Sequence, residues 1–465
     1  MKANILISIL LLLSVAIRAQ TFLVDTLLYN GDPNRYLNMV IVGDGYTASE
    51  QDKLRTDADD LSKLVFKKRP FSNYVGYFNV FLIHVVSQES GAIHPNTAAD
   101  CSSAAPPVPI SNPKTYFKTT FDYGNIHRLV VPTNYLAFVE VLSNNIADYD
   151  IVFVVVNTPY YGGSGGTYAT ATAHDDAGEI AAHEIGHSFA FLADEYWAGN
   201  PSEKPNMTQQ SNPALVKWKN WLNTPGTGIS IYPFSEDQAW HRPHQSCLMR
   251  QLKNPFCSVC TEAIIERIHT LTKPIVSHSP TTATIASSER YLPFRLTQVM
   301  KPLPNTLKTT WQLDGNPVAS NTDEYILDQL PLSMGLHTLN LTLLDTTALS
   351  KDALHPTTHV SMLKWNIQKS TVGTEVISST NKISYSIFPN PIGEVLTVEF
   401  ELENPELVRL ELMTTDGRII QVLNAERRAA GNHAVQHDIG QLPAGTYWLV
   451  LQFDATRQVQ RVVKL

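Results

Sequence analysis

The sequence predicts an α/β domain followed by two all-β sandwich domains. Three observations support this prediction. Apolar runs typical of buried strands alternate with helical patterns up to about residue 273. Short alternating segments without long helical periodicity fill residues 275–370, and a second set fills residues 385–465. The length of 465 residues allows several domains, each with its own core.

The N-terminal residues 1–19 have the pattern of a signal peptide. Lys2 supplies the positive charge, residues 5–17 form an apolar run, and Ala19 ends a plausible cleavage site. The apolar run is shorter than the roughly 20 residues that a membrane helix needs. The mature chain is therefore expected to be exported without a membrane span. Its net charge of −8, without blocks of like charge, disfavours nucleic acid or an anionic membrane as a partner.

The first domain, residues 24–273, reads as a mixed sheet with helices. Strands are expected at residues 38–42, 78–86, 126–131 and 151–157. Helices are expected over residues 47–66, 136–144, 176–192 and 261–269. Thr47 with Glu50, and Asp176 with Glu179, have the spacing of capping boxes at two of the helix starts. Residues 89–112, rich in Ala, Pro and Ser, predict a long loop.

The helix expected at 176–192 contains an H-E-x-x-H motif. His183 and His187 are four residues apart, so on a helix they lie one turn apart on the same face. Their imidazole nitrogens can then point at one metal ion, with Glu184 beside them as a general base. Two histidines on a core helix can also produce this pattern by chance, so the neighbouring residues decide between the two interpretations.

A catalytic zinc usually keeps three protein ligands and an open position. On an unbroken helix, Asp194 would lie about 10 Å beyond His187 along the axis, too far for a ligand bond of about 2 Å. We therefore expect the helix to stop near Ala190 and the chain to fold back. Asp194 would then be the third ligand, with Glu195 supporting it. The alternative third ligands are Glu195 itself, Glu262 and Glu266.

The stretch HEIGHSFAFLADEY resembles the HExxHSFxxLxDEY signature of the IgA-peptidase family of zinc metallopeptidases. The segments NMVIVGDGYT, FNVFLIHVVSQESGA, YYGGSGG and SCLMR…FCSVC resemble that family in the same order. This resemblance implies a zincin-like (metzincin-like) fold and a Zn²⁺ cofactor. Metzincins commonly place a glycine three residues and the third ligand six residues after the second histidine. Here these positions are Ala190 and Ala193, and the acid comes one place later.

Two other features are interpreted through the same resemblance. Gly162 and Gly163 precede the helix that contains the H-E-x-x-H motif. In a zincin, an edge strand at this place can pair with an extended substrate; a flexible hairpin loop is the alternative. Met249 matches the methionine turn that lies below the metal in metzincins, with a plain core filler as the alternative. The nearby His241 and His244 are expected to be surface or cleft-wall residues.

The chain has four cysteines: Cys101, Cys247, Cys257 and Cys260. In an exported protein an even number of cysteines predicts disulfides. We expect a bridge from Cys247 to Cys257 or Cys260, which would fix the Met249 loop to the following helix. A zinc ribbon would need a second close pair of cysteines in addition to Cys257-x-x-Cys260.

The two C-terminal domains are predicted from strand and turn signals. Residues 275–370 contain alternating segments and an Asp314-Gly315 turn, which predict an immunoglobulin-like sandwich. Residues 371–384 form a Ser/Thr/Gly linker. The segments SIFPNPIGEVLTVEF and LPAGTYWLVL in residues 385–465 resemble the type IX secretion C-terminal sorting domain. The resemblance implies export across an outer membrane by a secretion machinery, and a carbohydrate-binding module is the alternative.

Together these patterns predict a secreted zinc-dependent endopeptidase that hydrolyses protein substrates with a metal-activated water. His183, His187 and Asp194 would hold the zinc, and Glu184 would be the catalytic residue. A secreted binding protein or adhesin on a retained zincin fold is one alternative. A peptidoglycan amidase is the other.

Overall fold

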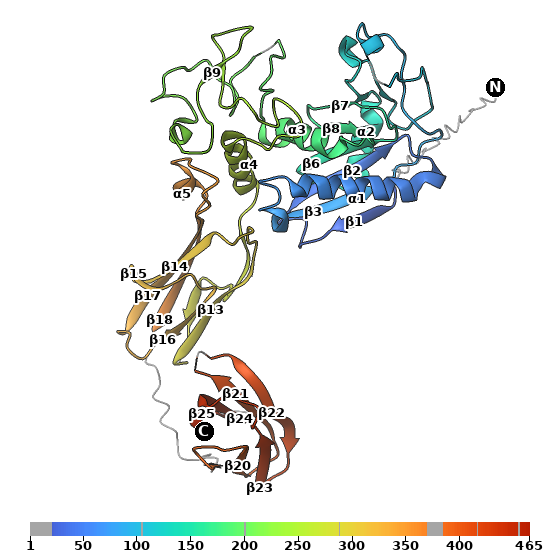
Figure 1. The fold of residues 1–465 in the computed structure, drawn as a ribbon. Helices are drawn as coiled ribbons and strands as arrows, with labels where there is room; N and C mark the ends of the chain where they lie inside the picture. Colours follow the sequence, from blue (N-terminus) through green and yellow to red (C-terminus); the bar gives the residue numbers. More distant parts are fainter. Residues whose placement is uncertain are drawn as a thin grey trace, which may run out of the picture. The chain divides into compact units, whose positions relative to one another are not determined.

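The computed structural model describes residues 21–465 except 104, 105, 200, 288, 370–384, 416, 454 and 455. The predicted signal peptide (1–19) and linker (371–384) lie outside the described residues. The chain divides into two compact units, Met1–Ser370 and Thr371–Leu465 (Figure 1). In the described part of the chain, no helix combines the length and the apolar character needed to cross a bilayer.

A six-stranded sheet with the order β1-β3-β2-β6-β8-β7 is the centre of the first unit. Its strands are β1 (Val24–Leu28), β2 (Leu37–Asp44), β3 (Phe78–Ile83), β6 (Ile151–Val156), β7 (Gly163–Ser164) and β8 (Ala169–Thr172). The four inner strands are parallel, with Val40 of β2 between Phe81 and Val152 in register, and both edge strands are antiparallel. Three of the inner strands, β2, β3 and β6, are mostly apolar because both faces of the sheet are covered.

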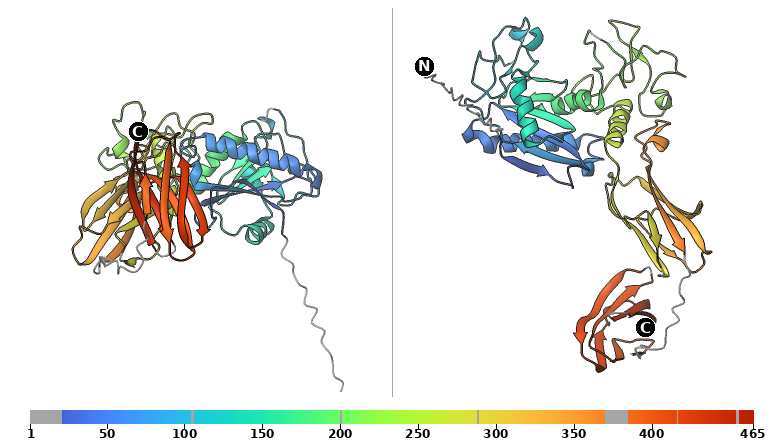
Figure 2. Two further views of the ribbon diagram at one scale, coloured as in Figure 1. Left: turned by 90° about the horizontal axis from the view of Figure 1, so that it is seen from below. Right: turned by 180° about the vertical axis from the view of Figure 1, so that it is seen from behind.

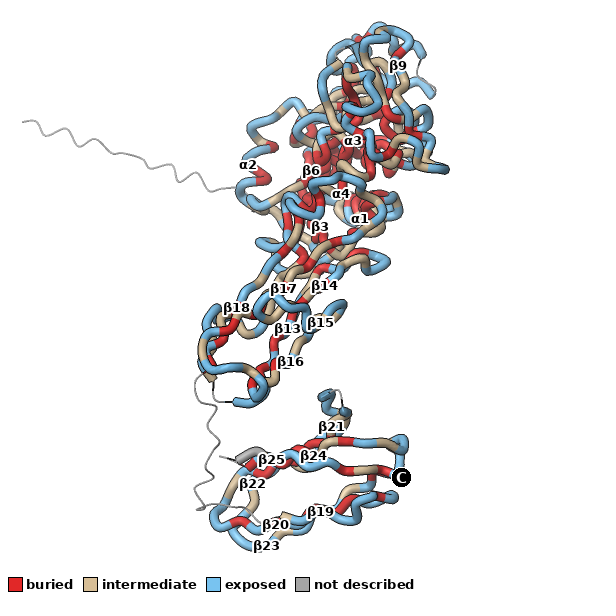
Figure 3. The backbone as a smooth tube through the Cα atoms, turned by 90° about the vertical axis from the view of Figure 1, so that its left-hand side faces the viewer, coloured by how far each residue is buried: buried red, intermediate tan, exposed pale blue. Residues whose placement is uncertain are grey.

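Helices cover the two faces of this sheet. The helices of the first unit are α1 (Gln51–Lys67), α2 (Tyr135–Asn145), α3 (Ala177–Ala190), α4 (Ser258–Leu271) and α5 (His355–Thr358). Met39 and Ile41 of β2 share one core with α1, α3 and α4, whereas Val40 and Val42 share another with α2. The period-two alternation of a strand therefore separates the two helical layers, which lie on opposite sides of the sheet in Figure 2. Buried residues follow the sheet and α3 (Figure 3).

Most predicted elements of this domain form, and two predictions were wrong. Residues 126–131 do not form a strand: they make one isolated bridge, Leu129 to Gly163, before the short strand β5 (Val131–Pro132). The backbone just before them turns through the left-handed region at Gly124 and Asn125. The capping box predicted at α3 does not form, although Asp176 is its N-cap residue. Lys253 contacts both acids instead, through its Nζ to Asp176 (3.0 Å) and its backbone N–H to Glu179 (2.9 Å).

The remaining short elements lie in the loops around the sheet. The strands are β4 (Thr119–Thr120), β9 (Tyr232–Pro233) and β10 (His241–Arg242). The 3₁₀ turns are η1 (Ala48–Glu50), η2 (Val75–Tyr77), η3 (Cys101–Ser103), η4 (Tyr123–Asn125) and η5 (Lys219–Trp221). At η1 the Thr47 N–H donates to Glu50 at 2.8 Å, as the predicted capping box requires.

Two further sheets pack face to face in the rest of the first unit. One contains β11 (Ile275–Ser279), β13 (Tyr291–Val299) and β16 (Glu324–Asp328). The other contains β12 (Thr284–Ala286), β18 (Ser361–Lys369), β17 (Gly335–Asp345), β14 (Leu307–Leu313) and β15 (Asn316–Ser320). Stacked rings of Trp311 and Trp365, 5.9 Å apart, lie in their shared core.

The second unit consists of two sheets around its own core. The first sheet contains β19 (Tyr385–Phe388), β20 (Val395–Leu402) and β23 (Gly431–Asp438). The second contains β22 (Ile419–Arg428), β21 (Glu406–Thr414), β24 (Gly445–Phe453) and β25 (Thr456–Lys464). Alternate residues such as Leu410, Leu412, Leu449 and Leu451 face inward and are fully buried, as strand periodicity requires.

A buried carboxylate joins the α/β part of the first unit to its sandwich. Asp345, at the end of β17, accepts hydrogen bonds from Tyr74 Oη and from His269 Nε2 at 3.1 Å, both in the α/β part. Thr306 Oγ1 donates to the same side chain. Burial disfavours the charged carboxylate, but these hydrogen bonds outweigh it and lower the pKa of Asp345. The boundary predicted between residues 273 and 275 therefore falls inside one compact unit.

Replacing Asp345 by Asn should destabilise the first unit by about 2 kcal/mol, because buried donors lose a charged acceptor. The folded pKa of Asp345 lies below its ordinary value of 3.8, so this contribution is present above about pH 4 and is lost as pH falls further. Urea unfolding of D345N and wild type at several pH values measures both effects. Asp323→Asn, which breaks only an exposed pair with Lys301, should cost about 1 kcal/mol or less. Equal losses in the two variants would contradict the proposed role of Asp345.

Candidate metal centre and its cleft

The end of α3 places an acidic side chain beside the two histidines of the same helix. The helix stops at Ala190, and Phe191 adopts a left-handed conformation with φ of 57°. The Leu192 N–H donates back to Gly186 O at 3.0 Å, which closes a Schellman-type turn and reverses the chain. Four residues after the helix ends, Asp194 faces the turn that carries His183 and His187.

Three ligand atoms converge at this point. Asp194 Oδ1 lies 3.0 Å from His183 Nε2 and 3.2 Å from His187 Nε2, and the two nitrogens are 3.1 Å apart. Tetrahedral ligands at about 2.0–2.1 Å from a zinc ion would be about 3.3 Å apart. The three atoms therefore fit three corners of such a site, and the fourth corner is left for a non-protein ligand.

The other ring nitrogen of each histidine is held by a backbone carbonyl. His183 Nδ1 lies 3.0 Å from Leu248 O, and His187 Nδ1 lies 2.7 Å from Leu192 O. A carbonyl can only accept, so each Nδ1 carries the proton and each Nε2 keeps its lone pair for a cation. Metal-binding histidines are commonly fixed in this way.

The electrostatics of the three residues favour positive charge between them. Burial opposes the charged form of His187, but the hydrogen bond and charge of Asp194 outweigh it and raise its pKa to about 9. The pKa of His183 is raised by the same carboxylate against the same burial effect. Burial would raise the pKa of Asp194, yet its hydrogen bonds to the two histidines lower it strongly. A divalent cation supplies the positive charge that this arrangement stabilises.

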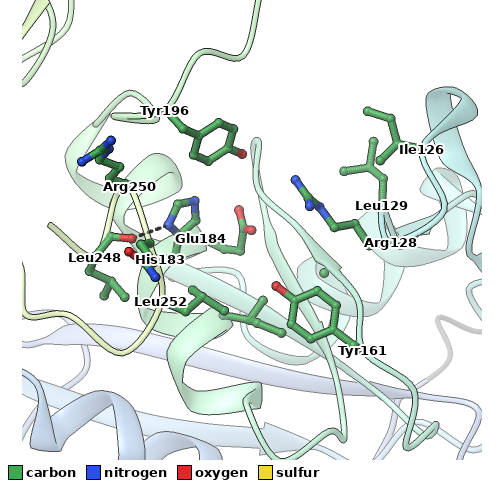
Figure 4. A pocket seen from close by; sticks show the side chains of 13 residues that line it. Ile126, Arg128, Leu129, Tyr161, His183, Glu184, Tyr196, Leu248, Arg250 and Leu252 are labelled. Carbon is green, nitrogen blue, oxygen red and sulfur yellow. Dashed lines mark hydrogen bonds between the residues drawn. The ribbon is translucent and has the colours of Figure 1, made fainter. Parts of the chain in front are cut away.

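Glu184 points into a cavity of about 410 Å³ beside the three ligands (Figure 4). Burial raises the pKa of Glu184, and the two histidines compensate only in part. Gly165 allows the carboxylate to occupy this position, because a Cβ atom there would lie 2.3 Å from Glu184 Oε2. A carboxyl with a raised pKa beside a cation site is suited to proton transfer.

Three side chains that sequence reasoning did not assign also face this cavity. Arg128, Tyr161 and Tyr196 surround Glu184 in Figure 4. Arg128 comes from the segment that was expected to be a strand, so no sequence pattern placed it at the site. Tyr196 ends the signature stretch, and its position in that stretch was the available signal. Its pKa is raised by burial and by the charge of Asp194.

A second cavity of about 170 Å³ is lined by His187, Asp194, Trp197 and Met207 among others. The larger cavity is lined by His183 and Glu184. Each of the two cavities therefore includes at least one of the three candidate ligand residues.

The edge strand β7 is not open where substrate pairing was expected. The N–H of Gly163 donates to Arg128 O at 3.0 Å, and its carbonyl accepts from Val130 N at 3.3 Å. Gly162 O accepts from the Thr172 N–H at 3.1 Å. A Cβ at either glycine would meet neighbouring atoms at 2.5 Å, so both glycines serve close packing here.

Met249 lies beneath α3, which is the position that the methionine-turn hypothesis predicts for it. It is fully buried, and a Cβ at Gly186 would lie 2.7 Å from its sulfur.

The alternative third ligands Glu262 and Glu266 lie away from the two histidines. Glu262 accepts from Trp221 Nε1 at 2.8 Å, and Glu266 pairs with His355 at 2.7 Å.

Three other residues considered from the sequence lie away from the two histidines. Glu195 Oε1 faces Cys260 at 3.2 Å and Asn206 at 3.2 Å. His244 Nδ1 accepts from the Ser246 N–H at 2.9 Å, and His241 belongs to β10. The structure therefore brings Asp194, and none of the alternatives, to the two histidines.

The disulfide expected from Cys247 is not formed. All four cysteines are free, and the sulfurs of Cys247 and Cys260 are 3.7 Å apart. The reason is that three thiols, those of Cys247, Cys257 and Cys260, meet at one point together with Glu195, so no two of them form an isolated pair.

Comparisons with known families agree with the sequence resemblance. Residues 26–239 match the family model for IgA Peptidase M64, and residues 386–465 match that for the secretion system C-terminal sorting domain. The first match implies a metallopeptidase. The second indicates export across the outer membrane, to the cell surface or beyond it. Met249 and the three clustered cysteines lie outside both matches. No curated protein matches the sequence.

Similar solved structures add no further argument. Dimeric latent PorU from Porphyromonas gingivalis matches 41% of this chain and 20% of its own length at 13% identity and a TM-score of 0.16. The Bacteroides ovatus mixed-linkage glucan protein SGBP-B matches 39% of this chain and 42% of its own at 17% identity and a TM-score of 0.15. This chain thus spans about a fifth and about two fifths of the two proteins.

Gly165→Ala should lower kcat/KM for peptide cleavage by about 100-fold, because the added Cβ displaces the Glu184 carboxylate by about 1 Å. The closest clash is with the end of a flexible side chain, so the unfolding temperature should change little. Because His187 Cδ2 would lie 3.0 Å from the same Cβ, zinc content is measured together with kcat/KM. Gly76→Ala is the control, since a Cβ there meets only Lys301 O at 3.6 Å. Full activity in G165A would show that the position of Glu184 beside Gly165 is not needed.

Proposed function

We propose that this chain, whose residues 26–239 match the IgA Peptidase M64 family, is a secreted zinc-dependent endopeptidase. The observation that carries the proposal is the convergence of His183 Nε2, His187 Nε2 and Asp194 Oδ1 within 3.2 Å of one another at the edge of a cavity. The catalytic domain would comprise residues 24–273 in a zincin-like fold. Met249 would be its methionine turn.

The residues present fit a catalytic zinc. Two imidazoles and one carboxylate form a donor set that zinc accepts, and a fourth position stays free of protein, as catalytic sites require. A Zn²⁺ ion at this point would supply Lewis acidity toward water and toward the peptide carbonyl. His183 and His187 would bind as neutral imidazoles, because their Nδ1 protons are held by Leu248 O and Leu192 O.

Glu184 would transfer the proton. In peptide hydrolysis a water adds to the carbonyl carbon, the C–N bond breaks, and the departing nitrogen gains a proton. Glu184 would accept the proton from the attacking water and deliver it to the amine. Its raised pKa supports this role, because a carboxyl that is a weaker acid holds the proton more readily between the two transfers.

The shape of the cleft supports internal cleavage of a protein chain. Two cavities adjoin the candidate ligands, one lined by His183 and Glu184 and one lined by His187 and Asp194, so the site has room for more than one substrate residue. Arg128 and Tyr161 face Glu184 across the larger hollow and would position the substrate backbone or the carbonyl oxygen (Figure 4). The C-terminal unit would address the enzyme to the secretion machinery.

A binding protein on the same fold explains the site less well. A partly buried carboxyl with a raised pKa reduces stability and has no use in a module that needs only its shape. The peptidase proposal gives Glu184 a task that requires this environment.

Glu184→Gln should reduce caseinolysis by about 10²–10⁴-fold, since the amide cannot take up a proton, while zinc binding is retained. Cleavage of casein, of IgA and of a peptide library, together with zinc content by mass spectrometry, measures both. Glu140→Gln, an exposed change on α2, is the matched control and should be fully active. Chelation should abolish wild-type activity, and added zinc should restore it.

Two results would contradict the proposal. The first is cleavage of casein by E184Q at the wild-type rate. The second is the absence of any cleavage of the peptide library by folded wild-type protein that has zinc bound at its histidines.

A further inference from the structure

Four buried side chains outside the catalytic ligand set meet at one point. They are Glu195, Cys247, Cys257 and Cys260, with exposed fractions of 0%, 0%, 6% and 0%. Glu195 follows Asp194 directly, Cys247 lies in the loop before Met249, and Cys257 and Cys260 lie at the start of α4. Three separate segments of the chain therefore each contribute to the cluster.

The distances match a tetrahedral site rather than a disulfide. Cys247 Sγ and Cys260 Sγ are 3.7 Å apart. Glu195 Oε1 lies 3.2 Å from Cys260 Sγ and 3.8 Å from Cys257 Sγ. Sulfur ligands at about 2.3 Å from zinc are about 3.8 Å apart, and a sulfur and an oxygen ligand are about 3.5 Å apart. Sulfurs in a disulfide would be about 2.05 Å apart.

The surroundings of Glu195 favour a bound cation. Its carboxylate is fully buried, and it forms no ion pair with a basic side chain in the described part of the chain. Its Oε2 has no hydrogen-bond partner there, while Oε1 accepts from Asn206 Nδ2 at 3.2 Å. A buried carboxylate with an unsatisfied oxygen is costly unless positive charge is supplied.

The helix start favours thiolate ligands. Cys257 is the N-cap residue of α4, and its N–H points at Cys247 Sγ at 3.3 Å. Backbone N–H groups at a helix N-terminus stabilise negative charge, including that of thiolates. A Cys-x-x-Cys pair at a helix start with a third cysteine ten residues before it is a spacing that closes around one ion.

We propose that Glu195, Cys247, Cys257 and Cys260 bind a second metal ion, zinc or another thiophilic divalent cation. All four positions are filled by protein and buried, so the site is closed and structural. Binding releases the thiol protons to solvent, which makes loading dependent on pH. A disulfide between two of the thiols would still leave Glu195 Oε2 without a partner.

This second ion would fix the two chain segments that position the candidate catalytic ligands. Glu195 is adjacent to Asp194, and its N–H donates to Met249 O at 2.7 Å. Cys247 is adjacent to Leu248, whose carbonyl holds His183 Nδ1. One ion therefore fixes both the loop beneath α3 and the segment that carries the third catalytic ligand. Its ligand set does not depend on the proposed peptidase function, but this positioning role does.

The test separates the two ions by removing the catalytic ligands. The full-length variant H183A/H187A, purified with zinc present, should retain one zinc more than its derivative with Cys260→Ser. X-ray absorption of H183A/H187A should show three sulfur neighbours at about 2.3 Å from zinc. Ser258→Ala in the same helical turn is the matched control and should leave the zinc content unchanged. None of these readouts requires peptidase activity.

Wild-type protein decides the question if a cysteine variant fails to fold. Intact mass after alkylation under denaturing, non-reducing conditions should show all four thiols reactive once the metal is chelated. A disulfide among Cys247, Cys257 and Cys260, or a zinc without sulfur neighbours in H183A/H187A, would overturn the proposal. Equal zinc content with and without Cys260→Ser would also overturn it.

Discussion

The reversal of the chain after α3 is the constraint on which the site depends. A helix can present two histidines one turn apart, but it cannot bring the acid seven residues further on to the same point. The left-handed Phe191 and the bond from Leu192 N to Gly186 O turn the chain within two residues. Asp194 then lies about one hydrogen-bond length from both imidazoles.

The same reversal explains why the loop that carries Met249 lies where it does. The carbonyl of Leu248 orients His183, and Met249 O accepts from the backbone after Asp194. Gly186 leaves room for the Met249 sulfur directly beneath the motif. The helix, the returning segment after it and this loop thus pack together, and a buried cluster of three thiols and a carboxylate lies beside them.

The sequence was sufficient for the parts of the fold and site that depend on local periodicity. The apolar runs of β2 and β6, the extent of α3 and its end at Ala190 follow from strand and helix patterns and from the spacing of the motif.

Prediction from the sequence failed where tertiary contacts override local signals. The segment 126–131 has a strand-like composition, yet it forms the wall of the cleft and carries Arg128 into it. Gly162 and Gly163 were expected to leave an edge open, but the backbone groups of both glycines are already paired. Cysteine counting predicted a bridge because sequence spacing does not reveal that Glu195 joins the three thiols.

The central claim is that His183, His187 and Asp194 hold one metal ion with a free position beside Glu184. Anomalous diffraction at the zinc edge, from crystals of the zinc-loaded protein, tests this claim most directly. The geometry predicts a peak about 2 Å from His183 Nε2, His187 Nε2 and Asp194 Oδ1. The claim would be contradicted by the absence of a peak between these atoms, or by a peak there whose third protein ligand is Glu262 or Glu266.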